Sequence, residues 1–141
     1  MATWTKFQDY AEKKNKAVHD WSTHTFKVAL TNTAPNVATH AVLADITEIG
    51  AGNGYSAGGT DTQNDGTESG GTLTVTGVDV VFTASGGSIG PFRYAVLYND
   101  TPTSPADPLI GWWDYGSSIA PAIGQTFTVS MDAVNGFATV G

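Results

Sequence analysis

The chain has 141 residues and a mass of 14.7 kDa, the size of one domain with one ordinary hydrophobic core. Hydrophobic residues make up 40% of it, which excludes wholesale disorder, and charged residues make up only 13%. The formal net charge of −7 argues against a nucleic-acid-binding protein that works through phosphate contacts. The lack of cysteine excludes disulfides, thiol chemistry and thiolate zinc sites.

The beginning of the chain and its apolar runs indicate a soluble protein. The first residues lack the basic-then-apolar pattern of a signal peptide, and no apolar run approaches the length that spans a bilayer. We therefore expect one soluble domain over residues 1–141 that binds neither nucleic acid nor membrane. Nothing in the sequence predicts a cofactor.

The charges are distributed unevenly along the chain. Residues 1–16 contain two acids and four of the six cations, Lys6, Lys13, Lys14 and Lys16, which gives a net charge of +2. The remaining two cations and eleven acids give residues 17–141 a net charge of −9. A basic head on an acidic body can dock on an acidic surface, including a second copy of the chain. The alternative is a solvated, lysine-rich helix face.

One segment near the start has helical periodicity. Apolar residues recur at the three-four spacing of one helical face: Phe7, Tyr10, Ala11, Val18 and Trp21. Thr5 followed by Gln8 is typical of a capping box at a helix start. These signals predict one helix over about residues 6–20. We expect its apolar face to pack on the rest of the protein and Lys13, Lys14 and Lys16 to face a partner.

After the helix the period of the pattern changes to two, which predicts strands. Alternating or short apolar runs occupy residues 24–32, 46–49, 72–82, 92–98, 109–115, 126–131 and 137–140. The parity changes at Gly77, which predicts a bulge or bend, and residues 92–98 are apolar on both faces, which predicts a central strand. Asn135–Gly136 predicts a turn. The pattern favours an antiparallel β-sandwich or jelly-roll-like barrel over residues 24–141.

Residues 50–71 contain eight glycines, and Tyr55 is their only large side chain. A segment with so little to bury loses much chain entropy on ordering, so we expect a long surface loop. Long loops inside compact domains are often functional. The composition predicts an interaction arm that neighbouring chains, rather than its own core, would order, with Tyr55 as a contact residue.

Two motifs in this loop resemble enzyme signatures without their context. Gly54–Gly58 matches the nucleophile elbow of hydrolases, but no helical pattern follows Ser56, and all three histidines precede it. Gly52–Gly54 also resembles a dinucleotide-binding turn but lacks a βαβ pattern. We therefore expect no catalytic residues and no enzymatic activity.

A possible cation loop and the histidines carry little metal-binding signal. Asp61–Gly66 has oxygen-bearing residues at EF-hand positions, but Thr72 stands where a bidentate Glu is required. An Asp/Gly-rich turn explains this segment better, although Glu68 leaves a cation site open. His24 and His40 are far apart in sequence, which favours ordinary polar roles. We expect no metal site.

Trp112 and Trp113 form the strongest aromatic cluster, together with Tyr115. Adjacent residues of a strand point to opposite faces, so one tryptophan should lie in the core and the other should be exposed or covered by a neighbour. We expect a core role plus a subunit contact. Stacking on a sugar ring is the alternative.

Several runs of the sequence resemble small structural proteins of tailed bacteriophages. These runs are Phe26–Pro35, Val42–Ile46, Gly52–Tyr55 with Gly58–Gly59, Phe82–Gly87, Gly90–Tyr94, Val96–Asp100, Leu109–Trp112 and Asp114–Ser117. The resemblance covers nearly the whole chain. It implies a virion protein, and the closest role is that of a capsid decoration, or cement, protein. It supplies no catalytic residues.

The resemblance implies location and partners. We expect the protein on the outer capsid surface, bound to the major capsid protein and self-associated as a homotrimer. A tail-associated, receptor-binding or glycan-binding virion module is the alternative. The candidate partner-binding residues are Lys13, Lys14, Lys16, Tyr55, Trp112 and Trp113.

Overall fold

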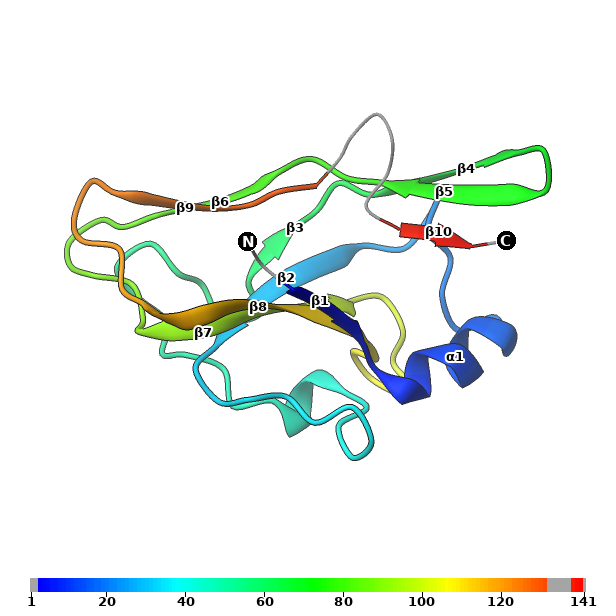
Figure 1. Cartoon of the computed structure of the whole chain (residues 1–141), viewed down its shortest axis with the longest axis horizontal. Helices are drawn as coiled ribbons and strands as arrows, with labels where there is room; N and C mark the ends of the chain where they lie inside the picture. The colour runs from blue at the N-terminus through cyan, green and yellow to red at the C-terminus, as the bar shows by residue number, and fades with distance from the viewer. Residues whose placement is uncertain (1–2, 132–137, 141) are drawn as a thin grey trace.

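The computed structural model describes residues 3–131 and 138–140, and these form a mainly β protein with one α-helix and antiparallel sheets (Figure 1). The first half contains β1 (Thr3–Lys6), α1 (Gln8–Asn15), β2 (Phe26–Thr31), a 3-10 turn (Leu43–Asp45), β3 (Thr60–Asp61) and β4 (Asp65–Ser69). The second half contains β5 (Thr72–Thr76), β6 (Val80–Thr83), β7 (Phe92–Asn99), β8 (Leu109–Ile119), β9 (Thr126–Val129) and β10 (Ala138–Val140).

The main sheet has the strand order β1-β8-β7-β2-β3, and every neighbouring pair is antiparallel. The strand β7 is therefore central, as predicted from its apolar residues on both faces. Tyr94, Val96 and Tyr98 lie on one face of β7, and Ala95 and Leu97 lie on the other. All five are buried, so both faces of this sheet are covered.

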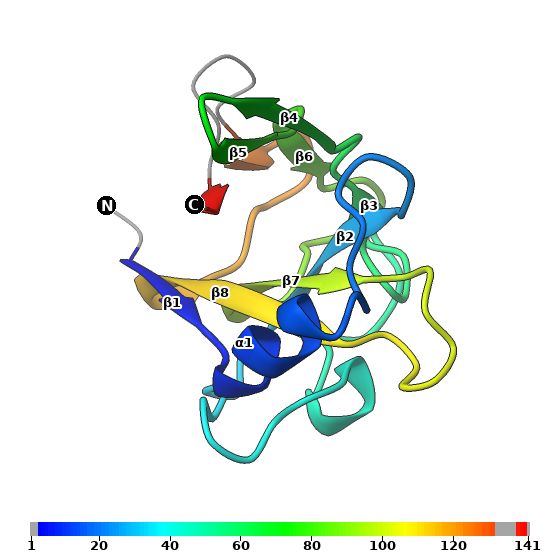
Figure 2. The same cartoon turned by 90° about the vertical axis from the view of Figure 1, so that its right-hand side faces the viewer.

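A second layer lies over one face of the main sheet (Figures 1 and 2). It consists of the sheet β10-β5-β4 and the two-stranded sheet β6-β9. The predicted change of parity at Gly77 is the break between β5 and β6, which belong to different sheets. Within the described residues the three sheets keep separate hydrogen bonding, so the strands form a sandwich-like arrangement rather than a closed barrel.

The other face of the main sheet is covered by irregular segments and the start of α1 (Figure 2). Phe7, Leu43 and Ile46 pack there against Trp112 and Val96. A cluster of buried core residues fills the space between the two layers and includes Phe26, Leu30, Phe82, Phe92 and Val129. The main sheet is thus the middle layer of the protein.

The helix is shorter than the sequence predicts, since it spans Gln8–Asn15 instead of residues 6–20. Thr3–Lys6 is a strand because it pairs with β8, a contact that local periodicity does not reveal. Phe7 is the N-cap residue and no side chain caps the helix, so the Thr5–Gln8 capping box is not formed. Trp21 follows the helix in a turn, but it is buried as expected.

The loop prediction for residues 50–71 is only partly correct. Residues 50–59 are irregular, but β3 pairs with β2, and β4 forms a hairpin with β5. The predicted strand at residues 46–49 is not formed; a single bridge joins Glu48 to Thr31. The predicted strand at 137–140 is present as β10, and the predicted turn at Asn135–Gly136 lies outside the described residues.

Candidate functional site

The predicted contact residues lie on three different parts of the fold: Lys13, Lys14 and Lys16 on α1, Tyr55 in the irregular segment 50–59, and Trp112 and Trp113 on β8. The helix lies against β8, because the ring of Phe7 packs 4.7 Å from that of Trp112. The helix that carries Lys13 and Lys14 therefore begins beside the strand that carries the two tryptophans. Tyr55 does not join them.

Two of the lysines pair within the helix. Lys13 Nζ lies 3.3 Å from Asp9 Oδ1, and Lys16 pairs with Glu12. The Lys16 ammonium holds the pKa of the Glu12 carboxyl below its ordinary value. Lys14 is half-buried and Lys16 is exposed. Both ion pairs lie within residues 3–16, so they do not change the net charge of +2 of this segment.

Trp112 and Trp113 point to opposite faces of β8, as predicted. Trp112 is 8% exposed and belongs to the cluster beneath the main sheet. Trp113 packs against the cluster between the layers, and its ring lies 4.6 Å from that of Trp4 on β1. The predicted covering neighbour of the second tryptophan is therefore Trp4.

Trp4 is the exposed aromatic residue that the sequence analysis missed. Its side chain is 37% exposed, and its ring lies over Gly111, where a Cβ would come within 2.6 Å of the indole and of the Thr5 carbonyl oxygen. Glycine at this position therefore leaves room for the indole. Residues Thr3–Lys6 alternate in the way that a strand does. The spacing of Thr5 and Gln8, however, matched a capping box and favoured the start of a helix instead.

The segment Thr3–Asn15, which we call the N-terminal rim, comprises the edge strand β1, at the left of Figure 2, and α1, which faces the viewer there. Among the described residues β1 pairs with β8 alone, so its outer edge has unpaired backbone groups. Trp4 and Lys6 are both exposed and lie on the same face of β1. An unpaired strand edge beside an indole and a cationic helix is a surface suited to binding another protein.

Tyr55 is a core residue, which corrects the prediction that it is a contact residue. It is 2% exposed, and its ring lies 5.7 Å from that of Phe82. Its hydroxyl donates to Glu48 and accepts a hydrogen bond from Leu30 N at 3.1 Å. Burial and the Glu48 carboxylate raise the pKa of the Tyr55 phenol above its ordinary value. The segment 50–59 is thus ordered by the protein's own core, not by neighbouring chains as expected.

The outer face of the second layer is rich in hydroxyl side chains and has few charges. Register pairs Thr67 with Thr74, Val81 with Thr128, and Thr83 with Thr126. Val78 and Val81 are 48% and 49% exposed. Uncharged β-branched residues form a stiff surface at which two acidic proteins can approach without charge repulsion.

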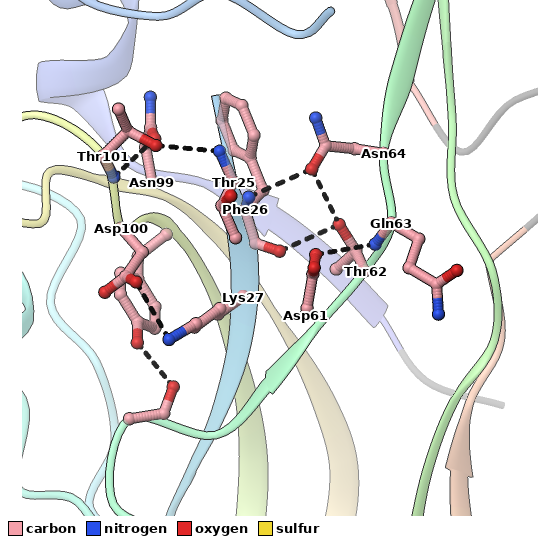
Figure 3. A network of polar contacts seen from close by, with 12 residues as sticks. Thr25, Phe26, Lys27, Asp61, Thr62, Gln63, Asn64, Asn99, Asp100 and Thr101 are labelled. Atoms are coloured by element: carbon pink, nitrogen blue, oxygen red, sulfur yellow. Dashed lines mark hydrogen bonds and ion pairs between the residues drawn. The ribbon is translucent and has the colours of Figure 1, made fainter. Parts of the chain in front are cut away.

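A network of polar contacts holds the turn before β2 (Figure 3). Asn64 accepts a hydrogen bond from Phe26 N at 3.0 Å and donates to the carbonyl oxygens of Trp21 and His24. Thr62 is fully buried and donates to the Phe26 carbonyl oxygen at 3.0 Å. These bonds attach the segment after α1 to the start of β4.

The carboxylates of the possible cation loop are engaged with backbone groups. Asp61, Asp65 and Glu68 accept hydrogen bonds from the amides of Gln63, Gly66 and Gly71 at 2.8, 2.8 and 2.7 Å. Such bonds are typical of Asx-type turns. The described part of the chain contains no group of three or more His, Cys, Asp or Glu residues that could hold a metal ion.

A second polar cluster joins two histidines through one amide. Asn99 Nδ2 lies 3.1 Å from His19 Nδ1 and 2.9 Å from His24 Nδ1, and Asn99 is fully buried. Local sequence patterns do not reveal this cluster, because Asn99 lies 75 to 80 positions after the two histidines. His40 is not part of it; its Nδ1 accepts from Asn36 N at 3.1 Å.

Comparison with known proteins gives no relative. No family model, no curated protein and no solved structure matches the chain at a significant level. None of the helices in residues 3–131 and 138–140 is long and apolar enough to cross a membrane.

Proposed function

We propose that the chain is a structural protein of a bacteriophage virion, and that it decorates the capsid. In this role it binds the major capsid protein on the outer surface of the shell, self-associates as a homotrimer and stabilises the assembled lattice. The protein acts by binding and has no turnover.

The positions of the resembling sequence runs support this proposal. Phe26–Pro35 contains β2, Val96–Asp100 contains the second half of β7, and Leu109–Trp112 begins β8. These three strands are neighbours in the main sheet. The likeness to phage structural proteins therefore falls on residues that build the framework of the fold.

The N-terminal rim is the observation that carries the binding role. It combines an unpaired strand edge, the exposed ring of Trp4 and three cations, Lys6, Lys13 and Lys14, on a chain whose remainder is acidic. A ligand that binds only the assembled lattice stabilises it by mass action, about 2.7 kcal/mol per site at a hundredfold excess over Kd. Because the contribution is repeated over many sites, moderate affinity is sufficient.

Trp4 also supports a second candidate, a tail-associated module that binds a host receptor or glycan. An exposed indole can stack on a sugar ring. The two roles differ in copy number and in what the particle loses without the protein. A decoration protein is present in hundreds of copies, whereas a tail module is present in few.

Particles with and without the protein test the proposal. Decoration predicts density over the shell in a cryo-EM map and particles that assemble without the protein but release DNA at a lower temperature. If particles without the protein are as heat-stable as intact ones yet fail to adsorb to cells, the decoration role is overturned and the receptor-binding role replaces it.

A rim variant tests which surface binds. Trp4→Ala should weaken binding to particles that lack the protein, because it removes the exposed anchor of the rim. Ile123→Ala is the matched control, since Ile123 is 67% exposed and lies far from the rim in the chain. Equal binding by both variants would remove the rim from the interface.

A further inference from the structure

The hydrogen bonds around Asn99 determine where the protons of two histidines lie. Thr101 N donates to Asn99 Oδ1 at 3.1 Å, and a backbone amide can only donate. The amide oxygen of Asn99 therefore faces Thr101, and its NH2 group faces the two imidazoles. Each Nδ1 then receives one hydrogen of this group, because Asn99 Nδ2 lies 3.1 Å from His19 Nδ1 and 2.9 Å from His24 Nδ1.

An Nδ1 atom that accepts a hydrogen bond cannot carry a proton. Both rings are thus neutral, with their single proton on Nε2. His24 Nδ1 also faces Asp20 N at 3.3 Å, a second donor that favours the same tautomer. Protonation of either ring would place an N–H group against the NH2 group of Asn99. The amide cannot turn over to receive it without facing Thr101 N with a donor.

The surroundings of His19 also favour its neutral form. Its ring packs between the rings of Tyr10 and Phe26, with centroids 5.3 and 6.0 Å away. Asp9 on α1 favours the charged ring, but burial, His24 and Lys13 oppose it, with burial the largest effect. The pKa of His19 is lowered from 6.5 to about 4 as a result.

We propose that His19, His24 and Asn99 form an acid-sensitive latch that holds residues 16–25, the connection between α1 and β2, against the end of β7. In the closed state the shared amide joins this connection to β7, and Trp21 stacks on Phe26 with ring centroids 3.8 Å apart. Protonation removes the Nδ1 acceptors and opens the latch. His19 and His24 then lose their bonds to β7 and residues 16–25 loosen, while Asn64 still holds the carbonyl oxygens of Trp21 and His24 and β2 stays in the sheet.

The sign of the pH effect follows from the lowered pKa of His19. The neutral His19 ring takes up a second proton less readily in the folded protein than in the unfolded chain, where its pKa is 6.5. The latch is therefore fully stabilising above pH 6.5 and weakens as the pH falls towards 4. This inference is independent of the proposed virion role, since it concerns contacts within one chain.

Histidine NMR tests the latch directly. The 15N shifts of the imidazole nitrogens at pH 7 should show the Nε2–H tautomer for both His19 and His24, and His19 should titrate near 4. A proton on Nδ1 of either ring at pH 7, or titration of His19 at its ordinary value, would overturn the proposal.

The isosteric variant Asn99→Asp should reverse the preference. A carboxylate accepts hydrogen bonds from protonated Nδ1 groups, so the pKa of His19 should rise above 6.5 in this variant. His40→Gln is the control, since His40 lies outside the cluster and the titration of His19 should not change. An unchanged His19 titration in a folded Asn99→Asp protein would contradict the latch.

Hydrogen exchange measures the opening in the unchanged protein. Protection factors of the amides in residues 16–25 should fall between pH 6.5 and 4, whereas those of β7 should stay constant. Replacing both His19 and His24 by Gln should abolish this local pH dependence, because a glutamine side chain does not titrate. Equal loss of protection in β7 and in residues 16–25, or persistent pH dependence in the double variant, would show that acid acts elsewhere.

Discussion

The central strands and the N-terminal segment are held in different ways. The strands β2, β7 and β8 share ladders of hydrogen bonds, and β7 is buried on both faces by apolar residues. Residues 3–25 attach to the rest of the protein through one edge strand, aromatic contacts, the hydrogen bonds of Asn64 and an amide shared by two histidines. Burial of apolar side chains does not depend on pH, whereas the hydrogen bonds of the shared amide depend on the protonation of the two histidines.

This difference separates stability from responsiveness within one small protein. The latch concerns residues 16–25, which belong to no strand, so the framework stays folded when the latch opens. The exposed Trp4 and the helix α1 adjoin this connection on its N-terminal side. Variants in the two regions should therefore give effects of different size and extent.

The largest effect is expected for Gly59→Ala in the framework. A Cβ at Gly59 would lie 1.7 Å from the Val28 carbonyl oxygen, and φ is +77°. The clash and the strain should cost about 3 kcal/mol or more and lower the melting temperature by about 10 °C. Gly70→Ala is the control, since its φ of +60° is similar but nothing lies within 4 Å. Calorimetry that ranks the two variants equally would refute the close approach.

A pair of phenylalanine variants should separate the two regions. Phe92→Ala removes a fully buried ring between the layers and should lower the free energy of unfolding by about 3–5 kcal/mol. Phe7→Ala removes an equally buried ring, but it should cost less in global stability and increase exchange of the β1 amides, because the rim opens locally. Denaturant unfolding and hydrogen exchange measure both. Equal global losses would mean that the rim unfolds together with the sheet.

A smaller and local effect is expected for Gly111→Ala. The added methyl group would displace the Trp4 ring and press on the Thr5 carbonyl oxygen, each 2.6 Å away. We expect a more exposed Trp4, a red-shifted tryptophan emission and a loss of about 1–3 kcal/mol. Gly50→Ala has nothing within 4 Å and should leave the emission unchanged.

The smallest effect on stability is expected when Lys13, Lys14 and Lys16 are replaced together by Gln. The pairs they form are local to α1, so the melting temperature should change little. Attachment to particles should weaken at low salt more than at high salt, where screening already removes the attraction. Lys27→Gln removes one positive charge outside residues 1–16 and, as a control, should leave attachment unchanged. Unchanged attachment at low ionic strength would make these lysines a solvated helix face.

The sequence alone was sufficient for features that depend on alternation along one strand. The apolar residues on both faces of residues 92–98 predicted the central position of β7, and the parity change at Gly77 predicted the break between β5 and β6. The adjacent Trp112 and Trp113 had to face opposite sides of β8 for the same reason. Each of these features follows from neighbouring residues and the geometry of an extended chain.

Only the tertiary structure decided the features that depend on a distant partner. Thr3–Lys6 is a strand because β8 is beside it. Tyr55 is buried because its ring packs against that of Phe82 and its hydroxyl accepts a hydrogen bond from Leu30 N. The latch joins histidines to an asparagine 75 to 80 residues further on. Local patterns report the state of a residue's own segment, whereas pairing, burial of a lone aromatic ring and shared hydrogen bonds are set by which segments the fold brings together.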